Sequence, residues 1–350
     1  MKTGHQTILC ASLIILITAA AFSPVLQNRF TNWDDPDLLL NNNHIRGLSL
    51  KNVAVLFSTS FGGFGGYTPL VFVSYAIEYR FFGLNPKAFH ITNLVIHIIN
   101  SLLVFWLVTI ISNNMRIGLL VAALFGVHPL HVEAVAWIQG RKDLLFSLFY
   151  LGGLVCYRLF LKKKAKKLNY ILSLLFFALS LISKIAAVSL PLVILLMEYH
   201  QNRKLDRRSI VRAAPFLLLS LVFLALALIT IGHESGVFRA SKEHGSLLHN
   251  LTLFFYAFVF YISKFLIPIR LYARYSAGIG QYPWYILLNL TVFAVACLFL
   301  YVINRRRREP VVFGTTFFFL TLMPTLPFHF VGQPYADRYM YLPILVLLLI

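Results

Sequence analysis

The sequence predicts an all-α polytopic membrane protein, and three observations support this prediction. Hydrophobic residues make up 59% of the 350 residues and charged residues only 12%, and apolar runs recur almost to the end of the chain. Many of these runs approach the roughly 20 consecutive apolar residues that a helix needs to cross a bilayer. The net charge of +19 is concentrated in short segments between the runs, as the positive-inside rule requires of cytoplasmic loops. We therefore expect a lipid bilayer around the chain and no nucleic-acid partner.

The first apolar run, residues 7–26, is interpreted as a retained membrane helix. It resembles a signal peptide, but it is longer than a typical h-region, lacks a small-residue cleavage site and is followed by many similar runs. Together the runs predict about 10–11 transmembrane or re-entrant helices. The expected ranges are 7–26, 88–111, 117–137, 143–161, 168–184, 186–200, 213–232, 250–268, 284–303 and 311–328, with a last helix that begins near Tyr339.

Clusters of basic residues set the expected topology. They lie at 162–167, 203–212 and Arg305–Arg308, and we place them with Arg116 on the cytoplasmic side. The N-terminus is then inside, and the loop Gln27–Lys87 is outside. The other segments expected outside are Gln139–Lys142, Ile231–His249 and Phe328–Arg338.

The segment 250–268 conflicts with strict alternation, because a full crossing there would place Arg305–Arg308 outside. Its aromatic residues and Lys264 make it amphipathic enough to lie partly in the interface. We therefore predict that it is re-entrant or interfacial.

The loop Gln27–Lys87 is expected to carry the chemistry, because loops of this length are usually functional. It opens with Asp34, Asp35 and Asp37, three of only 12 carboxylates in the chain. The stretch Pro69–Phe82 mixes apolar, aromatic and charged residues, and it begins with a proline, which suits a first helical turn. We predict an external catalytic loop over 27–87 that contains an amphipathic helix on the membrane surface.

The three cysteines, Cys10, Cys156 and Cys297, all lie in apolar segments. Their spacing supports neither a disulfide framework nor a metal site. The sequence requires no cofactor. The three aspartates of the acidic cluster could hold a divalent metal ion, although we expect none there.

Polar residues inside apolar helices are costly, so each is a functional candidate. His90, Asn93, His97 and Asn100 follow one another at spacings that place them on one helical face. They serve either as interhelical hydrogen-bonding groups or as part of a site lining.

A second group of polar residues surrounds a proline at the end of the predicted helix 117–137. Pro129 is expected to kink this helix, which brings His128, His131 and Glu133 towards the external loop. Glu133 is interpreted either as an active-site carboxylate or as one half of an ion pair, for instance with Arg141 or Lys142.

Two further cations fall at predicted outer helix ends. Lys184 interrupts an apolar run, and Arg338 lies in the motif Asp337-Arg338-Tyr339. Lys184 either snorkels to the interface or binds phosphate, and Arg338 suits bidentate phosphate recognition.

Taken together, these residues resemble a family: the membrane module of the transmembrane and tetratricopeptide-repeat O-mannosyltransferases and their bacterial relatives. These are GT-C-fold glycosyltransferases related to the protein O-mannosyltransferases. The longest shared string is His128-Pro-Leu-His-Val-Glu-Ala-Val-Ala-Trp137. The other matching segments are Trp33–Asp35, Pro69–Leu70, Phe82–Pro86, Phe89–His90, Gly140–Asp143 and Ala336–Pro343.

The resemblance implies a sugar, mannose, carried on a polyprenyl phosphate and transferred to a hydroxyl acceptor such as a protein Ser or Thr. Asp34 or Asp35 would act as general base on that hydroxyl. The predicted catalytic residues are Asp34, Asp35 and Glu133. The predicted substrate-binding residues are His128, His131, Arg141, Lys142, Lys184, Arg338 and Tyr339.

The chain departs from the family pattern in three ways. Thr68 stands where relatives often have Arg, and Ile185 where they often have Glu. Tetratricopeptide repeats do not follow within the sequence, and we expect the chain to continue beyond Ile350, because it stops inside an apolar helix.

The alternative functions are a transporter or flippase and a catalytically inactive scaffold of the same fold. We expect the active face to be periplasmic if the protein is bacterial, in the inner membrane. If it is eukaryotic, we expect the lumen of the endoplasmic reticulum.

Overall fold

The computed structural model describes residues 2–58, 67–162, 165–234, 247–275, 291, 308–325 and 335–349. All regular elements in these ranges are helical, which confirms the all-α prediction. The α-helices are α1 (Lys2–Phe22), α2 (Leu50–Ser58), α3 (Pro69–Phe82), α4 (Pro86–Ser112), α5 (Met115–Val127), α6 (Val132–Ala136), α7 (Arg141–Leu161), α8 (Lys166–Leu181), α9 (Leu190–Asn202), α10 (Arg207–Glu234), α12 (Leu247–Leu266), α14 (Arg308–Leu322) and α15 (Ile344–Leu347).

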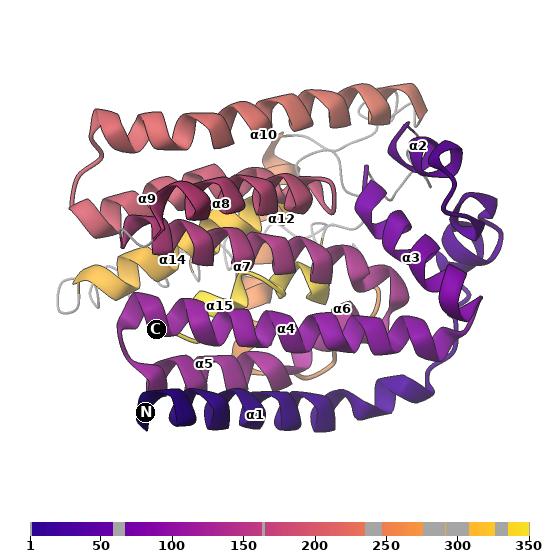
Figure 1. Cartoon of the computed structure of the whole chain (residues 1–350), viewed down its shortest axis with the longest axis horizontal. Coiled ribbons are helices and arrows are strands. Elements are labelled where there is room, and N and C mark those ends of the chain that lie inside the picture. The colour runs from indigo at the N-terminus through magenta and orange to yellow at the C-terminus, as the bar shows by residue number, and fades with distance from the viewer. Residues whose placement is uncertain are drawn as a thin grey trace.

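The long helices run along a common axis and form a layered bundle (Figure 1). Within the described ranges, four stretches are long and apolar enough to cross a membrane: Gly4–Gln27, Pro86–Ser112, Ile138–Leu161 and Arg207–Leu226. A bent pair, α5 with Pro129–Ala136, makes a fifth candidate. The chain is therefore a multi-pass membrane protein, as predicted.

The kink expected at Pro129 is confirmed. The two halves of the predicted helix 117–137 meet at an angle of 53°. His128 leaves the helical conformation, and its Nδ1 accepts a hydrogen bond from the Leu130 amide at 3.2 Å. A short 3₁₀ helix, Pro129–His131, separates the two halves, because proline cannot continue the hydrogen-bond ladder.

Two other boundaries also differ from the prediction. A 3₁₀ helix, Ile185–Ser189, separates α8 from α9 where two adjoining helices were expected. A 3₁₀ helix covers Asp337–Met340, and α15 begins at Ile344, whereas the last helix was expected to begin near Tyr339. The predicted helix 284–303 lies outside the described residues except at position 291, and positions 59–66 of the first loop also lie outside them.

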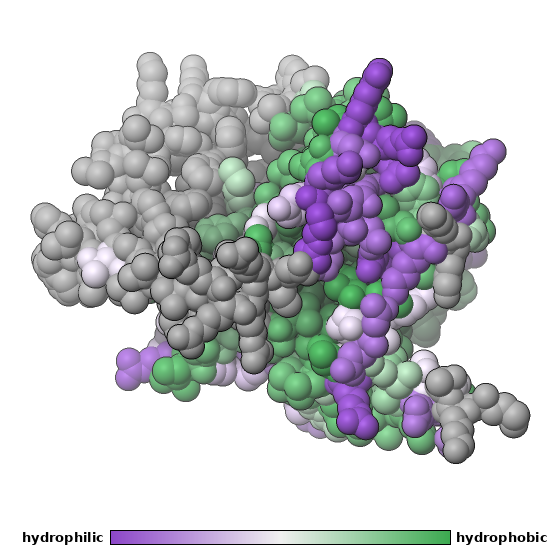
Figure 2. Space-filling view, turned by 90° about the vertical axis from the view of Figure 1, so that its left-hand side faces the viewer, coloured by the Kyte–Doolittle hydropathy of each residue, from purple (hydrophilic) through white to green (hydrophobic). Residues whose placement is uncertain are grey.

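The basic connections gather at one end of the bundle, which we call the basic end. The N-terminus and the α4–α5, α7–α8 and α9–α10 connections all lie there (Figure 1). Figure 2 views this end and shows a band of hydrophilic residues across it. The His200 and Phe313 rings lie 5.1 Å apart, which places the start of α14 beside the C-terminal end of α9. Arg308 thus joins the other basic clusters at this end.

The opposite end, which we call the loop end, carries α2 and α3 (Figure 1). The helix predicted over Pro69–Phe82 is confirmed with those bounds. It buries Tyr75 and Glu78 and exposes Ile77, Phe81 and Phe82. The segment predicted as re-entrant forms α12, and the chain after it, Leu271–Ala273, lines a pocket at the loop end. Whether α12 crosses the membrane stays a prediction.

Arg141, at the start of α7, ties α3 to the bundle. Its side chain is 0% exposed and forms an ion pair with Glu78 of α3. It also donates to the Asn93 Oδ1 and to the Phe89 carbonyl, each at 2.8 Å. The guanidinium lies 4.7 Å from the centre of the Tyr75 ring. One cation therefore holds the first loop, α4 and α7 together.

The polar face of α4 supports the hydrogen-bonding interpretation. The His97 Nε2 lies 3.1 Å from the Gly126 carbonyl, and the Nδ1 lies 2.7 Å from the Tyr341 hydroxyl. Asn100 donates to the same hydroxyl at 3.0 Å and to the Leu144 carbonyl at 3.0 Å. Because a carbonyl only accepts, Nε2 carries the hydrogen, and Tyr341 donates to Nδ1. These bonds fix the C-terminal segment against α4 and α7.

The ion pair between Arg141 and Glu78 gives the first prediction. Glu78→Gln should lower the free energy of unfolding by about 3–5 kcal/mol, because it leaves a buried guanidinium without its counter-charge. Thermal unfolding in detergent measures the change. The matched control is Arg80→Gln, an exposed position on the same helix. Equal stability of the two variants would show that Arg141 does not depend on Glu78.

Candidate active site

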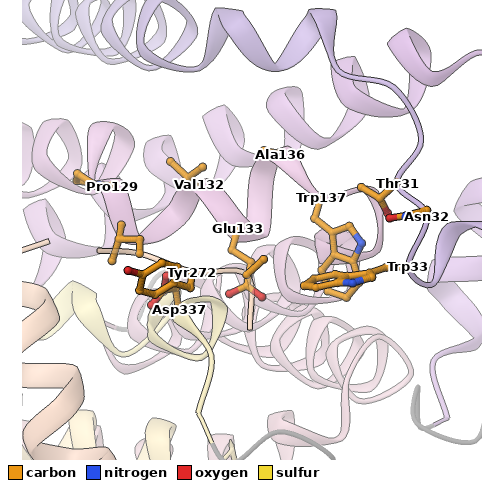
Figure 3. Close-up of a pocket in the computed structure, with 12 residues that line it drawn as sticks. Thr31, Asn32, Trp33, Pro129, Val132, Glu133, Ala136, Trp137, Tyr272 and Asp337 are labelled. Carbon is orange, nitrogen blue, oxygen red and sulfur yellow. The ribbon is translucent and has the colours of Figure 1, made fainter. Parts of the chain in front are cut away.

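A pocket of about 400 Å³ opens at the loop end of the bundle. It lies where the start of the first loop, the Pro129–Ala136 stretch, the segment after α12 and the start of the 3₁₀ helix Asp337–Met340 meet. Its lining residues are Thr31, Asn32, Trp33, Pro129, Val132, Glu133, Ala136, Trp137, Leu271, Tyr272, Ala273 and Asp337. In the view of Figure 3, Glu133 lies between Tyr272 and Asp337 on one side and the two tryptophans on the other.

Two tryptophans form the aromatic wall of the pocket. The Trp33 and Trp137 ring centres are 6.2 Å apart in an edge-to-face arrangement. Trp33 is 43% exposed, whereas Trp137 is buried. Edge-to-face pairs of this kind are favourable by about 0.5–1.5 kcal/mol beyond the burial of their surface.

Cations pack against the same wall. The Lys142 Nζ lies 5.3 Å from the centre of the Trp137 ring, and the Arg338 Cζ lies 5.2 Å from it. The Lys184 Nζ lies 5.0 Å from the Tyr339 ring. The four predicted substrate-binding residues Lys142, Lys184, Arg338 and Tyr339 therefore come together here.

Two of these three cations form ion pairs with carboxylates. Arg338 pairs with Glu133, and Lys184 pairs with Asp143. Lys142 has no carboxylate within ion-pair distance in the part of the chain that the structure describes. Of the three cations, Lys142 is therefore the one without a carboxylate partner among the described residues.

Glu133 is engaged through both oxygens. Its Oε1 pairs with the Arg338 guanidinium, and its Oε2 accepts from the Arg338 backbone amide at 2.9 Å. The interpretation of Glu133 as half of an ion pair is confirmed, but its partner is Arg338 and not Arg141 or Lys142, because Arg141 pairs with Glu78. Glu133 still lines the pocket.

The two adjacent aspartates differ in environment. The Asp35 Oδ2 accepts from the Thr31 amide at 2.7 Å and from the Thr31 hydroxyl at 3.0 Å. Its side chain is buried, and burial raises the pKa of Asp35 above its ordinary value. Asp34 is exposed and lies close enough to Lys142 for the two charges to attract. Asp35 therefore shapes the loop, and Asp34 faces solvent beside the cations.

Asp337 is a pocket residue that the sequence analysis did not choose. Both of its oxygens accept from the Tyr275 hydroxyl, at 2.8 and 3.0 Å. The side chain is 3% exposed, and burial raises the pKa of Asp337 to about 7. Its position next to Arg338 in the motif was the signal that would have identified it.

Three predicted substrate-binding residues lie elsewhere. Arg141 is fully enclosed, as described above. His131 is buried against the Tyr341 ring at 4.5 Å, and its Nδ1 lies 2.8 Å from the Phe125 carbonyl. His128 stacks on Phe265 with ring centres 5.7 Å apart. These side chains support the site rather than line the pocket.

No group of three or more His, Cys, Asp or Glu side chains within the described ranges is arranged to hold a metal ion.

Sequence comparisons connect the chain to known proteins. Protein O-mannosyl-transferase TMTC3 of Mus musculus is 31% identical over 155 residues, which are 42% of this chain and 16% of that protein. Protein O-mannosyl-transferase TMTC1 of Homo sapiens is 30% identical over 157 residues, 42% of this chain and 18% of that protein. Protein O-mannosyl-transferase F38B6.6 of Caenorhabditis elegans is 24% identical over 292 residues, 79% of this chain and 40% of that protein.

These similarities confirm the resemblance to the membrane module of the O-mannosyltransferases, and they agree with a GT-C type of helical membrane fold. The matched stretches cover less than a fifth of the mouse and human relatives. No protein-family model and no solved structure matches the chain.

The buried carboxyl of Asp337 predicts a pH-dependent stability. Its pKa is 3.8 ordinarily and about 7 in the folded state. Between these values the folded state binds more protons than the unfolded state, so the free energy of unfolding falls as the pH rises from 3.8 to about 7. The loss is at most about 4 kcal/mol. The charged and titratable neighbours are Glu133, Lys264, Arg338 and Tyr275.

Thermal unfolding at pH 5 and pH 8 tests this expectation. The parent should lose more stability over that interval than Asp337→Asn, which has no proton to release. Equal pH dependence in the two proteins would mean that Asp337 is ionised throughout.

Proposed function

We propose that the protein is a glycosyltransferase that moves a sugar from a polyprenyl-phosphate donor to a hydroxyl of a protein Ser or Thr. The sugar we propose is mannose. The observation that carries the proposal is the position of Lys142, which pairs with no carboxylate among the described residues. It lies against Trp137, which Arg338 also contacts, and close enough to the exposed Asp34 for their charges to attract. The names of the similar proteins, protein O-mannosyl-transferases, support the transfer of mannose to a protein. Chain 1–350 acts as a single membrane domain in this account, with 27–87 as its catalytic loop.

We place the reaction on the external face of the membrane. The basic end carries the clusters that the positive-inside rule assigns to the cytoplasm, and the pocket lies at the opposite, loop end. A donor lipid in the bilayer would present its phosphate at this height, while a protein acceptor arrives from the aqueous side. That side is the periplasm in a bacterium and the lumen of the endoplasmic reticulum in a eukaryote.

The donor phosphate is assigned to Lys142, with Arg338 beside it. An ammonium without a carboxylate partner gains most from a phosphate. Arg338 is held in place by Glu133 and adds positive potential without leaving its ion pair. Lys184 acts at longer range, because Asp143 already neutralises it. The Tyr339 ring contacts both Lys184 and Arg338, at 5.0 and 5.1 Å from its centre.

The transfer itself needs one base. Asp34 takes the proton from the acceptor hydroxyl while the hydroxyl oxygen forms a bond to the anomeric carbon of the sugar. The bond between that carbon and the phosphate oxygen breaks, and the electron pair stays on the phosphate, where Lys142 stabilises it. The proton on Asp34 then passes to solvent. A single displacement of this kind inverts the anomeric centre.

The assignment of the base is tested with Asp34→Asn. In proteoliposomes with labelled polyprenyl-phosphate mannose and Ser/Thr-rich peptides, transfer should fall roughly 10²–10⁴-fold while donor binding stays unchanged.

Asp35→Asn should instead lower thermal stability, because the Asp35 carboxylate accepts hydrogen bonds from the Thr31 amide and hydroxyl. The matched control is Asp37→Asn, which is exposed in the same cluster. A full transfer rate in Asp34→Asn would remove it as the base.

The phosphate assignment is tested with Lys142→Gln. Binding of polyprenyl phosphate should weaken roughly 10–100-fold, because a charge-assisted bond worth about 1.5–3 kcal/mol is lost. Lys87→Gln, an exposed lysine at the same end of the bundle, is the control and should bind as the parent does. Unchanged affinity in Lys142→Gln would place the phosphate elsewhere.

A further inference from the structure

The pocket walls contain groups that the transfer step does not use: Trp33, Trp137, Tyr272 and Asp337. We propose that this pocket is the subsite for the hexose ring of the donor, that Trp33 and Trp137 pack against its apolar face, and that Asp337 recognises its hydroxyl groups. The inference rests on the proposed function, because it takes the donor phosphate to lie at Lys142.

The position of Trp137 carries the argument. One indole contacts both cations, with Lys142 at 5.3 Å and Arg338 at 5.2 Å from the ring centre, and also lines the pocket. In a sugar phosphate ester, a single oxygen joins the ring to the phosphorus. A phosphate held by the cations on Trp137 therefore places the sugar ring against the same indole, inside the pocket.

The shape and chemistry of the pocket suit a hexose. Its volume of about 400 Å³ falls within the range of small-molecule sites. Two indoles supply apolar surface at one side and the Asp337 carboxylate supplies hydrogen-bond acceptors at the other, with Glu133 between them (Figure 3). A hexose has the same two-sided character, with C–H groups on a ring face and hydroxyl donors around its rim.

Asp337 is the carboxylate with acceptor capacity to spare. An ionised carboxylate accepts about four hydrogen bonds. Asp337 receives bonds from one donor, the Tyr275 hydroxyl, and has no cation within ion-pair distance among the described residues. Glu133, in contrast, is neutralised by Arg338. Sugar hydroxyls would supply the donors that this buried carboxylate lacks.

Such an acceptor discriminates between sugars. A hexose without the matching hydroxyl would leave a buried carboxylate oxygen unpaired, and sites of this type reject analogues that lack a hydrogen-bonding group strongly. Asp337 is therefore the residue expected to select the sugar, while Lys142 binds the phosphate of any donor.

The test compares two lipids on the full chain in nanodiscs: polyprenyl-phosphate mannose and the same polyprenyl phosphate without sugar. The ratio of their Kd values reports the contribution of the sugar. The parent should bind the mannosylated lipid more tightly. Asp337→Asn and Trp33→Ala should each reduce that ratio at least roughly 10-fold, with the affinity for the sugar-free lipid unchanged.

One control and one exposed test position separate loss of the subsite from damage to the fold. Trp106→Ala removes a tryptophan of similar exposure, 47%, from α4 and should leave the ratio unchanged. Trp33 is itself 43% exposed, so its removal keeps the inference testable even if Asp337→Asn fails to fold.

The outcomes distinguish this inference from the proposed function. Equal affinity of the parent for both lipids, or a ratio unaffected by both variants, would overturn the sugar subsite while the phosphate site stands. Equal weakening of both lipids in Asp337→Asn and Trp33→Ala would also overturn it, because the residues would then serve the phosphate or the fold. Binding of neither lipid by the parent would overturn both proposals.

Discussion

The ion pair between Glu133 and Arg338 is the interaction on which the site depends. It joins two segments that lie 205 residues apart in the sequence. The backbone amide of Arg338 binds the same carboxylate, so Glu133 fixes both the side chain and the start of the 3₁₀ helix that carries it. Breaking a buried pair leaves an uncompensated charge, which is strongly destabilising. Without this link Arg338 would have no fixed place beside Trp137, and the start of the 3₁₀ helix, with Asp337, would not be held at the pocket.

Charge neutralisation then determines what each cation does. The described site contains three basic side chains, and carboxylates pair with Arg338 and Lys184 but not with Lys142. The paired residues act as rigid parts of the wall, since their geometry is fixed by their partners. A further buried pair, Arg141 with Glu78, anchors the first loop in the same way at the start of α7. In this account structural ion pairs leave a single ammonium and a single exposed carboxylate, Asp34, for chemistry.

Local sequence patterns predicted the fold well, because apolar runs and basic connections depend on neighbours along the chain. They identified the helix over Pro69–Phe82 with its bounds, the bend at Pro129 and the common face of His97 and Asn100. The ends of helices were less predictable, since a 3₁₀ helix such as Ile185–Ser189 is a small change in hydrogen bonding that leaves hydropathy unaltered.

The sequence predicted several residues of the candidate site, but not which acidic side chain forms an ion pair with which basic one. The sequence singled out Glu133, Arg338 and Arg141, yet it does not say which acid meets which base, because those choices depend on how distant segments pack. Arg141 was expected at the substrate and is instead enclosed by α3 and α4. Asp337 was not chosen from the sequence, because its place in the pocket depends on the packing of the segment after α12 and the Pro129–Ala136 stretch around it.

The most direct test of the central claim is the structure of the donor-bound protein, determined in nanodiscs with polyprenyl-phosphate mannose. The account predicts phosphate density within hydrogen-bond distance of the Lys142 Nζ and sugar density against Trp33 and Trp137. Phosphate density at Lys184 with its Asp143 pair broken, or at the basic end of the bundle, would contradict it.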